Sequence, residues 1–189
     1  MSTPRDRMIL AAMKLFQREG YAATSWRRLV QDSGAPWGSA HHYFPEGKEQ
    51  LGLAALEVAT EGVARLFERS FAPGRSAADG VQSLFEVSAK QLEGSGYCEG
   101  CPVATVALEI ASTSPSLAAA CQKAFDRWRQ EIETGLVRCG VAADRAGQLS
   151  GTLLTLFEGG LVVARVTRST EPMLSAATTM RVLLEREAA

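Results

Sequence analysis

The amino-terminal part of this sequence contains two short predicted helices joined by a turn with a glycine, and few folds contain such a pair. Thr24 or Ser25 can cap the first of them, and Gly34 can end it. Pro36 can begin the second, which is expected to end near residue 44, ahead of the next proline and glycine. A longer helix over residues 4–19 precedes the pair, with a threonine cap, an early proline and a closing glycine. This order predicts a helix-turn-helix unit.

From residue 48 onward the sequence changes to longer helical segments. The expected helices cover residues 49–71, 77–93, 103–111, 115–139, 144–168 and 172–186. No alternation typical of strands is present, and no repeat recurs at a fixed period. We therefore predict an all-α protein with a three-helix helix-turn-helix domain at residues 1–47 and a larger helical domain at residues 48–189.

The charge along the chain separates these two parts. The whole sequence carries a net charge of −1, yet residues 1–31 hold six basic and two acidic side chains. A basic end on an acidic body suggests that the small domain binds a polyanion, although a merely solvated charged face has the same composition. The first residues lack the order of a signal peptide, so a cytoplasmic location is expected. Glycines and Glu158 interrupt the apolar run at 149–166, which favours a buried or interfacial helix over a membrane span.

The stretch "TSWRRLVQDSGAPWGSAHHYFPEGKEQL", Thr24 to Leu51, resembles the DNA-binding motif of the TetR family of bacterial repressors. The matching positions are Thr24, Leu29-Val30, Ser33-Gly34, Gly38 to Phe44, and Lys48-Glu49-Gln50-Leu51. Two later stretches, "EGCPVATVALE" at 99–109 and "FEGGLVVARVTRSTEPM" at 157–173, are similar to a subgroup close to multidrug-resistance repressors of the LmrA type. The resemblance implies a cytoplasmic homodimer that binds double-stranded operator DNA and does not enter a membrane.

The resemblance implies phosphate contacts for Tyr43 and Lys48, and the arginines of the second helix would add electrostatic affinity. The expected DNA-binding residues are Thr24, Ser25, Arg27, Arg28, Trp37, Gly38, Ser39, His41, His42, Tyr43 and Lys48. One departure from the family is an indole at Trp37, where a lysine is common. An indole can pack on a sugar or a thymine methyl, or donate one hydrogen bond to a phosphate.

Both histidines of the chain are adjacent, at His41 and His42, on the expected recognition helix. Consecutive helical residues lie about 100° apart, so the two imidazoles cannot share one face. Three interpretations remain: contact with DNA, packing or capping within the domain, and metal binding. A metal site would need the pair four residues apart or a third ligand nearby, and the sequence shows neither.

The resemblance also implies an effector pocket among the middle helices and a dimer seam near the carboxyl end. Residues expected to line the pocket, which would suit a hydrophobic or cationic small molecule, are Phe85, Leu92, Cys101, Thr105, Leu108, Glu109, Phe125, Trp128, Thr155, Phe157 and Glu158. Residues expected at the seam are Leu153, Leu156, Gly160, Leu161, Ala164, Met180 and Leu183. Many of these side chains would equally serve as ordinary core. Effector binding would shift the helix over 49–71 and move the two recognition helices off the spacing of about 34 to 36 Å that operator half-sites require.

Cys98 and Cys101 form a C-x-x-C motif ahead of an expected helix. This motif supports an alternative function, a thiol-based redox-sensing regulator, and less directly a thiol oxidoreductase. No strand precedes it and no second C-x-x-C completes a zinc site. The sequence has no nucleophile elbow, phosphate-binding glycine loop or H-E-x-x-H motif. We therefore expect no enzymatic activity, no cofactor and no metal.

Overall fold

The computed structural model describes residues 3–110 and 112–187, which form nine α-helices and no strand. The helices are α1 (Pro4–Glu19), α2 (Trp26–Ser33), α3 (Trp37–Tyr43), α4 (Lys48–Ser70), α5 (Ala77–Gly94), α6 (Pro102–Ile110), α7 (Pro115–Arg138), α8 (Ala143–Thr167) and α9 (Glu171–Glu187). The predicted all-α fold is confirmed, and the helix boundaries lie within two residues of those expected. The expected end of the sixth helix at residue 111 lies outside the described residues.

The first helices begin and end where local signals place them. The Thr3 hydroxyl accepts a hydrogen bond from the Asp6 amide, and the Asp6 carboxylate accepts one from the Thr3 amide, which completes a capping box. These bonds from Thr3 lower the pKa of Asp6 below its usual value. Ser25, rather than Thr24, caps α2 by accepting the Arg28 amide, and Gly34 ends it in the left-handed conformation.

The chain divides into two compact units, each formed by separate stretches of sequence. The first unit, which we call the head unit, consists of residues 1–61 and 101–124, and the second, the bundle unit, of residues 62–100 and 125–189. Helices α4 and α7 contribute to both. This division by contacts does not test the predicted functional boundary between residues 47 and 48, which stays a prediction.

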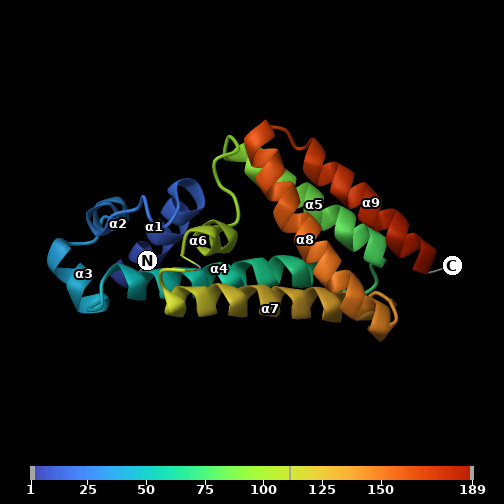
Figure 1. The fold of residues 1–189 in the computed structure, drawn as a ribbon, viewed down its shortest axis with the longest axis horizontal. Helices are drawn as coiled ribbons and strands as arrows, with labels where there is room; N and C mark the ends of the chain where they lie inside the picture. Colours follow the sequence, from blue (N-terminus) through green and yellow to red (C-terminus); the bar gives the residue numbers. More distant parts are fainter. Residues whose placement is uncertain (1–2, 111, 188–189) are drawn as a thin grey trace. The chain divides into compact units, whose positions relative to one another are not determined.

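The head unit contains α1, α2, α3 and α6 together with the first parts of α4 and α7. Helix α1 contacts α2, α3 and α6, as the blue and yellow-green ribbons in Figure 1 show. Its core is formed by fully buried side chains, among them Met8, Phe16, Leu29, Phe44 and Leu51. The head unit is therefore a small core that joins the helix-turn-helix to α6, a helix from much later in the chain.

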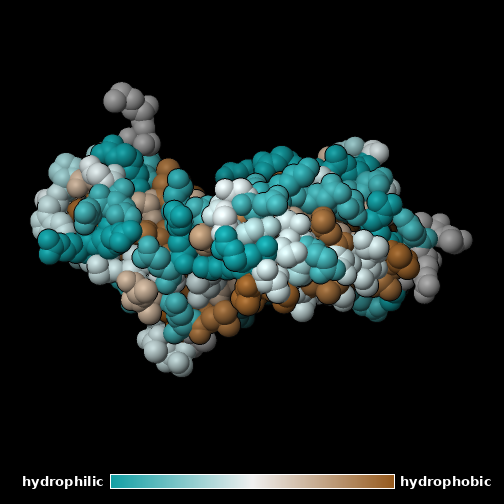
Figure 2. All heavy atoms as spheres, turned by 90° about the horizontal axis from the view of Figure 1, so that it is seen from above, coloured by the Kyte–Doolittle hydropathy of each residue, from teal (hydrophilic) through white to brown (hydrophobic). Residues whose placement is uncertain are grey.

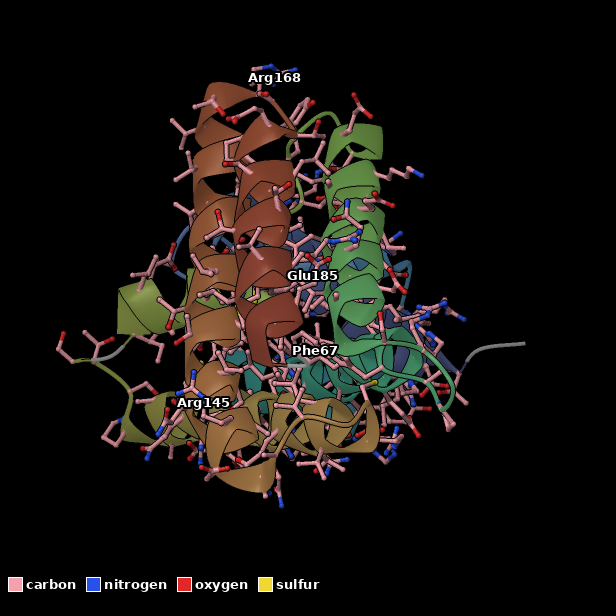
Figure 3. All side chains as sticks on the ribbon, turned by 90° about the vertical axis from the view of Figure 1, so that its right-hand side faces the viewer. Phe67, Arg145, Arg168 and Glu185 are labelled. Atoms are coloured by element: carbon pink, nitrogen blue, oxygen red, sulfur yellow. The ribbon has the colours of Figure 1, made fainter. Side chains whose placement is uncertain are left out.

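The bundle unit packs α5 against α8 and α9, which lie side by side in Figure 1. Aromatic rings fill its interior in edge contacts: Phe157 lies 5.5 Å from Phe67 and 5.6 Å from Phe85, measured between ring centroids. Trp128 lies 6.4 Å from Phe67. Phe67, labelled in Figure 3, has no exposed surface. Edge-to-face rings at these distances pack favourably beyond the area that they bury.

Candidate nucleic-acid interface

Helix α3 turns one face toward the head-unit core and leaves the other face open. Ala40, in its middle, is fully buried, and Phe44 directly after it is 1% exposed. Trp37 is 54% exposed, and both histidines are exposed as well. Among the other α3 residues predicted to touch DNA, Gly38 is exposed while Ser39 and Tyr43 are half-buried. A helix of this kind can offer its open face to a major groove.

The two histidines have different neighbours, in keeping with the predicted divergence of their faces. The His41 ring lies 5.4 Å from the Trp26 ring and 6.2 Å from the Trp37 ring, whereas His42 lies 5.3 Å from Tyr43. No group of three or more potential metal-ligating side chains occurs in residues 3–110 and 112–187. Trp26 was not predicted as part of this surface, because a tryptophan at the start of a short helix gives no indication of its ring partner.

The hydroxyls predicted to clamp a DNA strand are both engaged within the protein. Thr24 is fully buried, and its hydroxyl donates to the Gly20 carbonyl over 2.7 Å. Thr24 thus holds the turn before α2, and its predicted role as a DNA contact stays a prediction. Ser25 is exposed but accepts the amide of Arg28.

The two arginines of α2 differ in their surroundings. Arg28 lies 2.9 Å from Asp32 and 3.6 Å from Glu19. The hydrogen bond to Asp32 and the charges of both acids raise the pKa of Arg28 above its ordinary value. Arg27 is exposed, and within the described part of the chain its side chain makes no hydrogen bond or ion pair. Arg27 is thus the α2 cation better placed to meet a phosphate.

Lys48 begins α4, and its ammonium turns inward. Its Nζ donates to the Tyr21 carbonyl over 2.6 Å and lies 4.0 Å from the centroid of the Tyr21 ring. Glu109, predicted as a polar residue of the effector pocket, accepts the Ala22 amide in the same turn, with 2.7 Å between Oε2 and N. Two residues that the sequence assigned to different sites therefore meet on one turn of the head unit.

The residues predicted to bind an effector divide between the two units. Four of them are buried in the bundle unit: Phe85, Leu92, Trp128 and Phe157. Phe125, in the same unit, is half-buried and contacts the Trp128 ring edge to face. Both carboxylate oxygens of Glu158 are shielded from solvent, while Thr155 is exposed. Cys101, Thr105, Leu108 and Glu109 belong to the head unit, and Leu108 is 82% exposed. Their role in ligand binding stays a prediction.

A pocket of about 340 Å³ lies in the bundle unit, and none of the predicted effector residues lines it. Its lining residues are Ser76, Ala77, Ala78, Asp79, Cys139, Gly140, Val141, Arg181, Leu184 and Glu185. They come from the beginning of α5 and the residue before it, from the loop that follows α7, and from the last turns of α9. Arg181 and Glu185 pair across one helical turn on its wall, 3.2 Å apart, and Figure 3 labels Glu185.

The predicted seam residues mostly point into the protomer. Leu153, Ala164 and Met180 are fully buried and Leu161 is 9% exposed, so they have little or no surface left for a partner. Leu156 and Gly160 are half-buried, and only Leu183 is clearly exposed. The predicted seam stays a prediction, because an apolar residue on a largely apolar helix fits either a core or an interface.

The exposed apolar face of α8 and α9 includes Leu183 and is otherwise formed by residues that were not predicted for the seam. Exposed valines and leucines on these helices are Val162, Val163, Val166, Leu174, Val182 and Leu183. Hydrophobic patches gather over the bundle unit in Figure 2, whereas the surface over α1–α3 is mostly hydrophilic. By length and composition alone, α8 is the one helix among the described residues that could cross a membrane. A single such helix also occurs in soluble proteins as a core or interface helix.

None of the four cysteines forms a disulfide bond. Cys101 is buried, and its sulfur accepts the Ala104 amide in the first turn of α6 at 3.3 Å. Cys98 is half-buried, and its thiol donates to the Gly96 carbonyl at 3.5 Å. Whether this motif responds to redox state stays a prediction.

These features define the class of protein: a helical DNA-binding regulator, in which a helix-turn-helix with an open third helix precedes a larger set of long helices. Residues 9–55 match the family described as "Bacterial regulatory proteins, tetR family", and residues 77–179 match the "Transcriptional regulator LmrA/YxaF-like, C-terminal domain". The chain belongs to the TetR family of transcriptional regulators, with a carboxyl-terminal domain of the LmrA/YxaF-like type.

Relatives cover nearly the whole chain. It is 31% identical to the uncharacterized HTH-type regulator YxaF of Bacillus subtilis, over 97% of this chain and 96% of that protein. It is 30% identical to the HTH-type transcriptional regulator LmrA of the same species, over 96% and 97%. A TetR regulator from Legionella pneumophila shares the fold, with a TM-score of 0.86 at 22% identity over 97% of this chain and 98% of that one. These likenesses confirm the family that the sequence resembles.

Proposed function

We propose that this protein is a cytoplasmic, dimeric repressor that binds operator DNA through α3 and leaves it when a small molecule binds the bundle unit. The observation that supports DNA binding best is the open face of α3, with Trp37, His41 and His42 exposed over a buried Ala40. Arg27 on α2 is a second exposed group suited to a phosphate.

Dimerisation is proposed through the exposed apolar face of α8 and α9. Val162, Val163 and Val166 form a stripe on α8 together with the exposed Thr155 and Gly159. Several exposed valines on one face of a helix form an apolar patch of the kind that a partner surface covers. An isologous interface of this kind relates two protomers, and therefore two head units, by a twofold axis, and two paired half-sites of an operator require this symmetry.

A matched pair of variants tests this interface. Val162→Glu is expected to shift the protein from dimer to monomer in sedimentation equilibrium, because a carboxylate would be buried without a partner. Val87→Glu on α5 introduces the same charge at a valine of similar exposure, 38% against 50%, and should leave the dimer intact. Equal behaviour of the two variants would contradict the proposed seam.

Effector binding is proposed for the bundle unit, whose interior combines aromatic rings in edge-to-face contact with the shielded carboxylate of Glu158. Aromatic rings and a carboxylate suit a hydrophobic or cationic molecule. About 3 kcal/mol of coupling between effector and operator would change operator affinity more than a hundredfold.

Operator binding can be measured by fluorescence anisotropy on duplexes from the region upstream of the protein's own gene, with a scrambled duplex as control. Sequence-dependent binding that weakens steeply with salt would support the proposal, and duplexes selected from a random library would then define the operator. Binding equal to that of the scrambled duplex, together with no enrichment from the library, would contradict it.

A further inference from the structure

The turn between α1 and α2 receives contacts from two other helices. Gly20 and Tyr21 lie in it, and Thr24 closes it by donating its hydroxyl to the Gly20 carbonyl and its amide to the Tyr21 carbonyl, over 2.7 and 3.2 Å. The Tyr21 carbonyl also accepts the Lys48 ammonium from α4. The turn leads directly into α2, and through α2 it sets where α3 begins.

Glu109 reaches this turn from α6, 87 residues further along the chain. Its Oε2 accepts the Ala22 amide, and there is no spare room beside it: a Cβ on Gly20 would stand 2.0 Å from the other carboxylate oxygen. A charged acceptor on a backbone amide is among the stronger hydrogen bonds in proteins. The carboxylate thus ties α6 to the turn at a defined point.

Lys48 holds the same turn from α4. Besides its hydrogen bond to the Tyr21 carbonyl, the ammonium lies over the Tyr21 ring, where cation–π attraction adds to the contact. Burial lowers the pKa of Lys48 from its ordinary value, and the Glu109 carboxylate acts in the opposite direction. The ammonium is therefore partly withdrawn from solvent and balanced by a charge from α6.

Close packing reinforces the position of the ring. A Cβ on Gly52 of α4 would lie 3.1 Å from Cε2 of Tyr21, so the ring rests against the backbone of α4. Burial, and to a smaller extent the Glu49 carboxylate, raise the pKa of Tyr21 above its ordinary value. Glu49 also accepts hydrogen bonds from Ser114 and Ser116 at the start of α7. The beginning of α4 is thereby fixed on both sides.

We infer that Glu109 and Lys48 are positioning residues for operator binding: they form a turn clamp on residues 20–22, and Lys48 acts within the protein and not on a DNA phosphate. The inference rests on the proposed function, since it concerns how α3 is held for the operator.

Salt dependence separates a clamp from a phosphate contact. Operator affinity of the full-length protein is measured at several salt concentrations on the library-selected duplex, for wild type, Lys48→Gln and Glu109→Gln. We expect each variant to bind about fivefold to tenfold more weakly, because each removes one charged interaction. The slope of log affinity against log salt should equal that of wild type, since both variants still neutralise the same phosphates. Arg27→Gln serves as reference, with a slope smaller by about 0.9 for each phosphate that the variant no longer neutralises.

The second part of the experiment measures whether the effects of the Lys48 and Glu109 substitutions on operator affinity add up. The double variant should bind about as weakly as either single one, and hydrogen exchange of the Ala22 amide should accelerate in Glu109→Ala. Glu93→Gln removes an exposed charge from α5 and should change neither quantity. A reduced salt slope for Lys48→Gln, or unchanged affinity for Glu109→Gln, would overturn the inference. A wild-type protein that selects no duplex would instead overturn the proposed function.

Discussion

Side chains that bind backbone groups fix one turn of the head unit, whereas buried aromatic rings meet in the interior of the bundle unit. In the head unit, Thr24, Lys48 and Glu109 each bond to the turn at residues 20–22. In the bundle unit, Phe157 contacts two other phenylalanines. Packed rings tolerate no gap, while a polar turn can be released by moving one partner. We therefore expect the turn at residues 20–22 to change its geometry more readily than the ring contacts of the bundle unit.

The largest expected effect is on the stability of the bundle unit. Phe157→Ala removes a ring that is 3% exposed and contacts Phe67 and Phe85, so it should lower the free energy of unfolding by about 3–5 kcal/mol. Denaturant unfolding followed by circular dichroism measures it. Phe157→Leu, which refills most of the space, should cost clearly less; equal costs would show that the ring contacts contribute little.

A smaller loss is expected in the head unit, from two glycines that differ in backbone conformation and in available space: ψ is 171° at Gly20 and 18° at Gly34. Gly20 and Gly34 both have positive φ, +85° and +61°, but only Gly20 faces another group, the Glu109 carboxylate. Gly20→Ala should destabilise by about 3 kcal/mol, from backbone strain plus the displaced hydrogen bond. Gly34→Ala should cost about 1 kcal/mol. If thermal unfolding gave similar losses of stability for the two variants, the contact with the Glu109 carboxylate would not explain the loss at Gly20.

An exposed residue of the head should affect binding without affecting stability. Trp37→Ala removes a side chain that is 54% exposed, so the free energy of unfolding should change by less than about 0.5 kcal/mol. Operator affinity should fall about threefold to tenfold, with an unchanged salt slope, because an indole carries no charge. Anisotropy titrations at three salt concentrations check both parts, and a changed slope would contradict this role.

The smallest effect concerns two thiols that can report on the units separately. Burial raises the pKa of Cys121 in the head unit to about 11, and it also raises the pKa of Cys139 in the bundle unit. A raised thiol pKa favours the folded state below about pH 9, and this contribution fades as pH rises from about 9 to about 11. At pH 8, Cys121 should resist N-ethylmaleimide in the folded protein. Mass spectrometry during a urea titration would show which thiol becomes reactive first, and rapid labelling of native Cys121 would contradict its burial.

The sequence predicted the helices of the head because their signals are local. Thr3, Ser25 and Gly34 act on neighbours within three or four residues, and each does so in the structure. Local signals could not predict that Glu109 would bind Ala22, because that contact depends on how α6 packs on α1. Local signals could not predict the burial of Met180 either, since an apolar residue on an apolar helix fits either a core or an interface.

The composition of the head unit bears on how regulators of this family can be recombined. A graft that exchanges only residues 1–47 would leave α6 and the start of α7 from the recipient, although residues 101–124 belong to the same unit. The graft would then meet a foreign residue where Ala22 needs an acceptor. Chimeric regulators built from this chain should therefore transplant two separate segments together, so that an operator specificity moves with the helix that steadies it.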